Sequence, residues 1–243
     1  MKQQLAITGA VALALLAAGT TAQAQSAGSF YVTTGWFHLA PQDSSDPLKV
    51  MSVGGSPVNR SVPNTGAGIS DADTLGVTAG YFVTDHIAAE FVYGIPPKFN
   101  LTGQGSFSQF GTLGRAYQWS PALLLKYYFN SAEAKFRPYV GVGASYIYFT
   151  GAKLTNGAFE TGVLGGPTSV TTSNQWAPVF NAGFNYNFTK HWFAGLSISY
   201  IPVSLTATLT TQRASPVGNL TQTSQAHIKL NPIVSYVNIG YRF

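Results

Sequence analysis

Five stretches of the chain alternate, residue by residue, between larger apolar side chains and small or polar ones. In the clearest of them, one face carries Trp192, Ala194, Leu196, Ile198 and Tyr200, and the other carries Phe193, Gly195, Ser197 and Ser199. A period of two residues is typical of β-strands with one apolar face. The same pattern recurs at residues 74–81, 137–148, 176–188 and 237–243. The chain is therefore expected to fold mainly as β-strands.

The charge content indicates which face of these strands points inward. Charged residues make up 9% of the chain and hydrophobic residues 45%, whereas an ordinary soluble domain carries roughly 25% charged residues. This composition excludes disorder and a charge-rich coiled coil. A soluble barrel would place apolar residues inside and charges outside. Here the Gly and Ser face fits the inside of a narrow barrel, and the apolar face fits lipid.

The first residues have the features of an export signal. Lys2 precedes an apolar run from Leu5 to Ala18, and Ala22-Gln23-Ala24 follows as a cleavage site. We expect cleavage after Ala24, which leaves residues 25–243 as a single outer-membrane domain. The apolar run is shorter than the roughly 20 residues that span a bilayer. The chain has no Cys, so disulfides and thiolate sites are excluded.

Eight strands can be counted when three more segments are added to the five stretches, and these segments are 30–39, 87–102 and 112–129. The links between strands alternate in length. Residues 84–86, 130–136 and 189–190 form short links, and residues 40–73, 103–111, 154–174 and 210–220 form longer ones. Short periplasmic turns and long outer loops are typical of outer-membrane barrels. The sequence therefore predicts an all-β fold, an eight-stranded antiparallel transmembrane β-barrel in the bacterial outer membrane, with the first loop mobile.

Aromatic residues cluster at the expected strand ends, where amphipathic rings favour the membrane interface. The clusters are Tyr127, Tyr128 and Phe129; Phe184, Tyr186 and Phe188; His191, Trp192 and Phe193; and Tyr241 and Phe243. A terminal Phe is also what bacterial barrels usually present to their assembly machinery, so Phe243 is expected to contact it. The other expected partners are outer-membrane lipids and lipopolysaccharide.

Three segments resemble the OmpW family of small outer-membrane barrels. They are residues 84–90 (TDHIAAE), residues 135–143 (KFRPYVGVG) and the terminal Gly240-Tyr241-Arg242-Phe243. The order around Trp176 and Trp192 also fits the family. The resemblance implies a monomeric eight-stranded barrel with a narrow apolar lumen. It implies passive transport of small hydrophobic molecules, and one branch helps to import alkanes. Some members are phage or colicin receptors, so a structural or receptor barrel without transport is the alternative.

Strand parity points two groups of side chains into the lumen. Near the periplasmic end, Glu90, Lys126 and Arg242 are expected to form a polar plug, because a charge inside a membrane-embedded structure should be paired. Such a plug would only stabilise the barrel or would take part in ion or proton movement. Higher up, a second group is expected to line an apolar pocket or simply to fill the lumen; it consists of Val92, Leu124, Ile147, Val179 and Ser199. Eight strands leave little room for a water pore.

Five prolines fall within the strand patterns, although Pro cannot donate to a ladder and is avoided inside sheets. They are Pro96, Pro121, Pro178, Pro202 and Pro232. Counted from the periplasmic ends, all five lie at heights of roughly 20–28 Å. Either the strands part at this level and form a lateral opening into the membrane, or the strands end earlier and the prolines begin the loops.

Other functions have weaker support. A barrel hydrolase needs a nucleophile with a His and an acid near the rim. His38, His227, Ser224 and Asp73 offer such residue types without a pattern, so no enzyme activity is expected. Two imidazoles without a fixed carboxylate do not predict a metal site, and no cofactor is expected. Lys and Arg are scattered, which argues against nucleic-acid binding.

Overall fold

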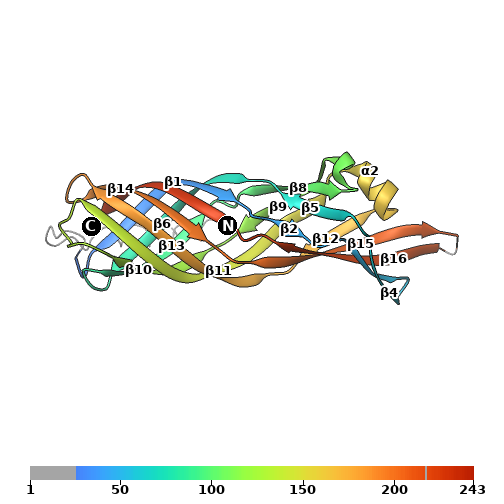
Figure 1. Cartoon of the computed structure of the whole chain (residues 1–243), viewed down its shortest axis with the longest axis horizontal. Helices are drawn as coiled ribbons and strands as arrows, with labels where there is room; N and C mark the ends of the chain where they lie inside the picture. The colour runs from blue at the N-terminus through green and yellow to red at the C-terminus, as the bar shows by residue number, and fades with distance from the viewer. Residues whose placement is uncertain (1–25, 217) are drawn as a thin grey trace, which may run out of the picture.

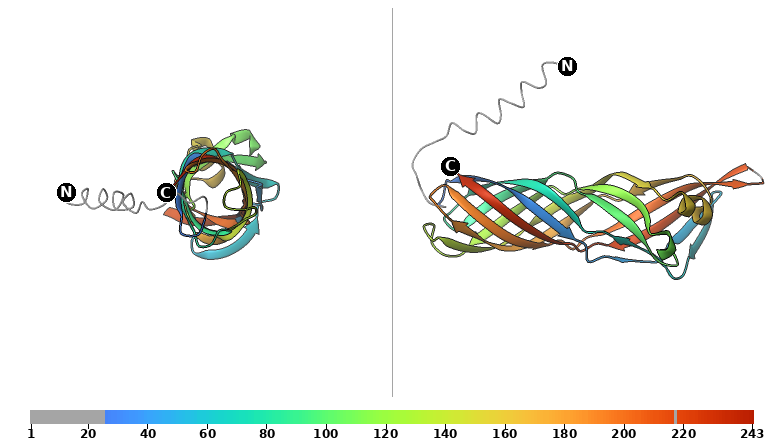
Figure 2. Two further views of the ribbon diagram at one scale, coloured as in Figure 1. Left: turned by 90° about the vertical axis from the view of Figure 1, so that its left-hand side faces the viewer. Right: turned by 90° about the horizontal axis from the view of Figure 1, so that it is seen from above.

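The computed structural model describes residues 26–243 apart from residue 217. The predicted signal segment, residues 1–24, lies outside the described residues. The chain forms a long cylinder of tilted strands (Figure 1), and the view along its axis shows a closed ring (Figure 2). Its strands tilt and pair with their neighbours throughout, as the alternation of apolar and small residues predicts.

Eight antiparallel strands close the membrane half of the cylinder, which confirms the predicted fold class. They are β1 (Phe30–Ala40), β6 (Ala72–Phe82), β7 (Ile87–Gly94), β10 (Ala122–Tyr128), β11 (Phe136–Leu154), β13 (Gln175–Asn187), β14 (Trp192–Tyr200) and β17 (Ile233–Arg242). Each pairs with the next in this order, and β1 pairs with β17 to close the ring, with Trp36 opposite Val237. The short turns at 83–86, 129–135 and 188–191 share one end, which is the periplasmic end by the usual rule.

The outer half of the cylinder is also built of strands, where loops were expected. The first predicted loop contains β2 (Ser44–Ser45), β3 (Lys49–Val53), β4 (Ser56–Ser61) and β5 (Thr65–Ile69). The others contain η1 (Ser108–Phe110), α2 (Gly157–Phe159), η2 (Glu160–Leu164) and β12 (Thr168–Thr172). The long hairpin of β15 (Ser204–Ser215) and β16 (Gly218–Lys229) reaches farthest from the membrane half (Figure 1). None of the helices among the described residues is long and apolar enough to cross a membrane.

Two segments that were predicted as single strands are interrupted. Residues 87–102 divide into β7 and β8 (Lys98–Gly105), and residues 112–129 divide into β9 (Thr112–Trp119) and β10. The breaks fall at Ile95-Pro96-Pro97 and Ser120-Pro121. The physical reason is proline, which fixes φ and supplies no N–H for a ladder. Above the breaks, β5, β8, β9 and the upper part of β11 form one wall, and β12, β15, β16, β3 and β4 form another.

The outer surface of the membrane half is apolar, as expected of a wall that faces lipid. Large apolar side chains stand exposed on it, among them Leu75, Leu123, Val142, Phe180 and Ile198. An exposed apolar surface of this extent would be costly in water. Both aromatic ends are present: Trp192 and Tyr241 pack together at the periplasmic end, and Trp119 stacks on Tyr148 at the outer end.

Aromatic rings also point into the lumen near the periplasmic end, because glycines on neighbouring strands make room for them. A Cβ added to Gly80 would lie 2.1 Å from the Tyr31 ring, and a Cβ on Gly240 would lie 2.2 Å from the Phe193 ring. Phe193, which was expected at the membrane interface, is therefore buried inside instead, and Tyr128, also expected at the interface, is buried in the same group of rings. The small inner face is a set of sockets for large rings from adjacent strands.

Candidate functional site: the barrel lumen

A cavity of about 80 Å³ lies in the membrane half of the lumen. It is bordered by four of the five residues predicted to line the lumen: Val92, Leu124, Val179 and Ser199. Much of the remaining wall is apolar and includes Phe37, Leu39, Ile201 and Val234. The fifth predicted residue, Ile147, lies apart from this cavity in a buried apolar cluster with Ala177 and Val203. The lumen at this level can therefore accept a small apolar molecule.

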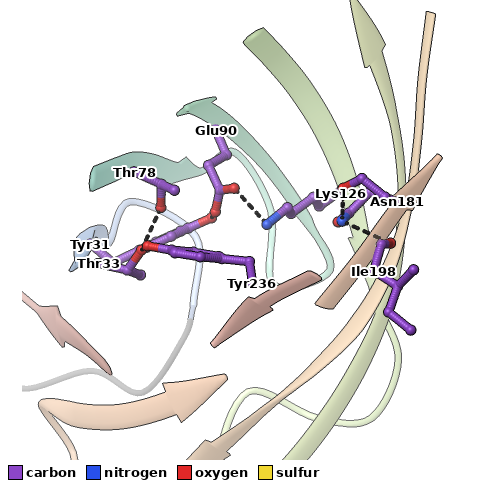
Figure 3. A network of polar contacts seen from close by, with 9 residues as sticks. Tyr31, Thr33, Thr78, Glu90, Lys126, Asn181, Ile198 and Tyr236 are labelled. Atoms are coloured by element: carbon purple, nitrogen blue, oxygen red, sulfur yellow. Dashed lines mark hydrogen bonds and ion pairs between the residues drawn. The ribbon is translucent and has the colours of Figure 1, made fainter. Parts of the chain in front are cut away.

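A buried ion pair closes the cavity on its periplasmic side. The Lys126 Nζ lies 2.6 Å from Oε1 of Glu90, and both side chains are buried. Tyr31 donates a hydrogen bond of 2.7 Å from its hydroxyl to Oε2 of Glu90 (Figure 3). β7 and β10 are paired neighbours, with Glu90 opposite Leu124, so the two charges meet diagonally across one ladder. We call Glu90, Lys126 and Tyr31 the floor of the cavity.

A group of hydroxyls beside the floor was not predicted from the sequence. The Thr33 Oγ1 lies 2.8 Å from the Thr78 Oγ1 and 2.8 Å from the Tyr236 hydroxyl (Figure 3). All three residues are buried. They share the inward parity of β1, β6 and β17, and this parity is the sequence signal that could have found them.

The predicted plug divides into two levels, because Arg242 does not join the floor. Its guanidinium donates to the Lys190 carbonyl and to the Asn187 Oδ1, each at 3.0 Å. Beneath the floor lies a layer of buried rings, Phe82, Tyr128, Tyr139 and Phe193, which the ring of Tyr31 contacts. Arg242 stands one inward position beyond Gly240, the residue paired with Phe193, and its guanidinium contacts the periplasmic turn instead of Glu90.

A second buried arginine, Arg137, accompanies Arg242 at this lower level and was also missed. Its side chain is fully buried and donates to the Asp85 carbonyl at 2.6 Å. The guanidinium of Arg137 lies 5.1 Å from the Tyr128 ring centroid, and that of Arg242 lies 5.2 Å from the Phe193 ring centroid. Cations over ring faces are attracted to them. The lumen is thus filled from the periplasmic end by arginines, then rings, then the ion pair.

Two further cavities continue the lumen outward. The next one, of about 80 Å³, shares Gln118 and Pro232 with the first and is almost wholly apolar. A third, of about 50 Å³, shares residues with the second, namely Leu101, Leu154, Val170, Ala207 and Ile228. The three cavities follow one another from the outer half down to the floor, and the two outer ones are the more apolar.

The wall of the first cavity is interrupted between two neighbouring segments of the chain. The last residue pair of the β7–β10 ladder is Val92 with Ala122, and the first pair of the β8–β9 ladder is Lys98 with Tyr117. In the interval between these two pairs, no residues of the two segments, both of which the structure describes, are paired with each other. Among the described residues, one backbone hydrogen bond crosses this interval, from the Gln118 N–H to the Pro97 carbonyl at 3.1 Å. We call this interval, residues 93–97 against 118–121, the ladder gap.

Three prolines explain the ladder gap, since Pro96, Pro97 and Pro121 lie in it and have no N–H to donate. Gly94, Ile95, Pro97 and Ser120 all border the first cavity. Ile95 does so although it is 62% exposed. The cavity therefore reaches the wall at the ladder gap.

The other predicted prolines, Pro178, Pro202 and Pro232, lie where hydrogen bonds still join the neighbouring strands. Across the break between β14–β15 and β16–β17, the Ile201 N–H donates to the Pro232 carbonyl at 3.2 Å and the Leu230 N–H to the Val203 carbonyl at 2.9 Å. The Asn231 side chain adds a bond from the Val203 N–H at 3.1 Å. Pro202 and Pro232 thus lie in a bridged break, and Pro178 lies inside β13, opposite Ala144.

Comparison with known proteins places this barrel. The model of the OmpW family matches residues 26–243. The chain belongs to the OmpW family. It is 30% identical over 234 residues to outer membrane protein W of Vibrio cholerae, which covers 95% of this chain and 97% of the relative. It is 29% identical to outer membrane protein AlkL of Ectopseudomonas oleovorans over 85% of this chain and 80% of the relative.

The fold of this OmpW-family barrel is shared with a solved structure. The crystal structure of OprG from Pseudomonas aeruginosa is similar with a TM-score of 0.77 at 24% identity, and the match covers 90% of this chain and 97% of OprG. The relatives are outer membrane proteins, which confirms the predicted location in the bacterial outer membrane.

The residue types of a rim hydrolase do not come together in this OmpW-family member. The His38 Nδ1 lies 2.9 Å from the Asp73 Oδ1. His227 and Ser224 lie on β16, which belongs to a different sheet, and the Ser224 hydroxyl accepts a bond from Gln222. No group of three or more His, Cys, Asp or Glu residues that could hold a metal is found in the part of the chain that the structure describes.

Proposed function

We propose that this barrel carries small hydrophobic molecules from outside the cell into the outer membrane, and that they leave the lumen sideways through the ladder gap. The observation that carries this proposal is the first cavity, whose wall combines apolar and polar residues, which is followed outward by a more apolar cavity and which borders the ladder gap. A solute in this cavity has the floor beneath it and the wall interruption beside it.

The floor favours a lateral route over passage to the periplasm. Moving through it would separate the Glu90 and Lys126 charges, and a buried charge without its partner is strongly unfavourable. Below the floor, the layer of rings and the two arginines fill the lumen further. We therefore include in the proposal that Glu90 and Lys126 seal the lumen, with Arg242 and Arg137 forming a separate lower seal.

The ladder gap supplies the exit because few hydrogen bonds must be broken there. Backbone groups in hydrocarbon need partners within the protein, so a wall normally resists opening. At the ladder gap three residues lack an N–H, and Ile95 is both exposed and in contact with the cavity. An apolar solute can pass between these two segments into lipid without breaking a complete ladder of backbone hydrogen bonds.

Uptake of an apolar tracer by intact cells tests the proposal. Cells with this protein should accumulate the tracer faster than cells with an equal amount of another eight-stranded barrel. Replacing Pro96, Pro97 and Pro121 together by Val restores donors to the gap, so uptake should fall several-fold toward the control. The matched control is Pro202→Val with Pro232→Val, because that break is already bridged.

Three results would be informative against the proposal. Equal uptake with this protein and the control barrel, across several apolar solutes, would favour the structural or receptor role. Unchanged uptake in the Pro96, Pro97 and Pro121 variant would remove the ladder gap as the exit. A loss of uptake in the Pro202 and Pro232 variant alone would move the exit to the opposite wall.

A further inference from the structure

Three cations lie together on the outer wall formed by β8, β9 and β11. Arg115 of β9 stands directly opposite Lys153 of β11, and Lys98 of β8 stands opposite Tyr117, two residues along β9 from Arg115. Directly paired residues on one face have Cβ atoms roughly 5 Å apart, and diagonal neighbours roughly 7–8 Å. Lys98 and Lys153 are exposed, and Arg115 is half-buried. We call these three residues the basic patch.

Strand alternation puts the side chains of the basic patch on the side of the wall that faces away from the lumen, while Arg115 and Lys153 also border the second cavity. Trp119 lies on this side, since its ring stacks on Tyr148 and approaches the exposed Tyr93. Tyr117 and Arg115 follow on the same face at two-residue steps. On β8, Phe99 follows Lys98 and is buried in an apolar cluster with Leu39. Because successive strand residues point to opposite faces, Lys98 faces outward.

The height of the basic patch matches the headgroups of the outer leaflet. Tyr93, Trp119 and Tyr148 form the aromatic row at the outer membrane interface, where such rings settle. Arg115 precedes Trp119 by four residues on β9 and lies farther from the membrane half. At about 3.3 Å per residue and a strand tilt near 40°, this is roughly 10 Å above the rings. The polar headgroup region extends roughly 5–8 Å beyond the hydrocarbon on each side, so long Arg and Lys side chains at this height can reach it.

The three cations have no partner within the described chain. No ion pair of Lys98, Arg115 or Lys153 is found among the described residues, whereas Lys126 pairs with Glu90 and His38 with Asp73. The Arg115 Nε is buried from solvent and has no hydrogen-bond partner. Like charges directly opposite each other destabilise a sheet, so the sheet gains if an external anion neutralises Arg115 and Lys153.

We propose that the basic patch binds a phosphate group of the phosphorylated glycolipid in the outer leaflet, the lipid A part of lipopolysaccharide. Arginine and lysine hold phosphate through charge-assisted hydrogen bonds. The aromatic row below packs against the acyl chains while the patch contacts the phosphate. The site does not depend on solute transport, and it requires only a barrel that stands in this leaflet.

Binding of purified lipid A to the full barrel in detergent micelles tests the inference. The wild-type barrel should keep bis-phosphorylated lipid A through gel filtration and show it as an added mass in native mass spectrometry. Arg115→Gln with Lys153→Gln should weaken binding at least tenfold. Lys49→Gln with Arg60→Gln is the matched control, because it removes the same charge from exposed positions on β3 and β4, and it should change binding less than twofold.

Further arms separate the phosphate, the lipid and the fold. Lipid A without its phosphates should bind no better to the wild type than intact lipid A binds to the Arg115 and Lys153 variant. Inorganic phosphate at the same concentration should not displace lipid A. Should that variant fail to show the heat-resistant migration of a folded barrel, Lys98→Gln with Lys153→Gln replaces it and should weaken binding at least threefold.

The inference is overturned if a folded patch variant binds lipid A as well as the wild type does. Equal binding of lipid A with and without its phosphates would also overturn it. Displacement by inorganic phosphate at equal concentration would show an unspecific anion site in place of a glycolipid site. If cells with this protein take up apolar tracers no faster than cells with the control barrel, while the purified barrel still binds lipid A, only the transport proposal is refuted.

Discussion

The Tyr31 hydroxyl reaches over Gly80 of β6 to Oε2 of Glu90 at 2.7 Å, while the other oxygen of the same carboxylate holds the Lys126 ammonium at 2.6 Å. Both oxygens of one buried carboxylate are therefore engaged, one by a neutral donor from β1 and one by a cation from β10. A buried ion pair is stable only when its remaining hydrogen-bonding capacity is also satisfied. Tyr31 meets this need, and it ties three strands to one point.

Breaking the ion pair from one side should destabilise the barrel strongly. Lys126→Met leaves the Glu90 carboxylate buried without a cation, which costs about 3–5 kcal/mol. Urea unfolding in micelles, followed by tryptophan fluorescence, measures this loss. Glu90→Gln combined with Lys126→Met removes both charges and should recover a large part of it. Heat resistance that is unchanged in Glu90→Ala would contradict a sealing role for the floor.

The socket for the Tyr31 ring should be intolerant of even one methyl group. Gly80→Ala places a Cβ 2.1 Å from the ring and forces it to move, at a cost of about 1–3 kcal/mol. The matched control is Gly94→Ala in the same hairpin, where the nearest atoms to an added Cβ are 3.7 Å away. Lower stability of Gly80→Ala in the same urea experiment, with Gly94→Ala near wild type, is the expected result. Equal stabilities would show that the ring relaxes freely.

Amide hydrogen exchange should locate the weakest part of the membrane wall. Residues 93–95 and 119–120 lie in the ladder gap. Their amides that are not bonded elsewhere should exchange at least tenfold faster than those of residues 88–91 and 123–127 on the same two segments. Residues 200–203 and 230–233 are the comparison, because hydrogen bonds bridge their break. Mass spectrometry of the barrel in lipid discs measures both. Slow exchange throughout residues 90–100 would count against a lateral opening.

Replacing the terminal aromatic residue should affect assembly in cells more than stability. The Phe243 N–H donates to the Phe30 carbonyl at 2.9 Å, and its ring contacts Tyr241. Because the backbone bond does not need the side chain, Phe243→Ala should refold in detergent with nearly wild-type yield. In cells, its folded fraction in the outer membrane should fall several-fold if the ring is read by the assembly machinery. Phe188→Ala, at another exposed periplasmic ring, is the control, and an equal loss in both would refute the expectation.

Alternation alone carries most of the information about the membrane half. It predicts the lipid-facing side and the inward placement of Glu90 and Lys126, because each of these depends only on residue parity. It does not give the relative heights of strands, which depend on their stagger around the ring. For this reason Arg242 was expected beside Glu90, whereas it binds Lys190 and Asn187 one level lower.

The outer half could not be predicted in the same way. Its strands, such as β15 and β16, are rich in Thr, Ser and Gln on the outer side, and this composition is also typical of loops. Large inward rings were missed for a related reason. Tyr128 and Phe193 are of residue types that also anchor barrels at the interface. For Phe193, only the position of Gly240 on the next strand shows that there is room for its ring inside.

The neutral ion pair at the floor also bears on how the cell's envelope behaves electrically. A lumen that ends in paired opposite charges and packed rings offers ions no hydrated path, so each copy should be silent in a conductance recording. Cells can then carry many copies of this barrel without dissipating the potential across the outer membrane through ion leakage. Such a protein selects solutes mainly by the free energy of removing their hydration water, and their charge or diameter matters less.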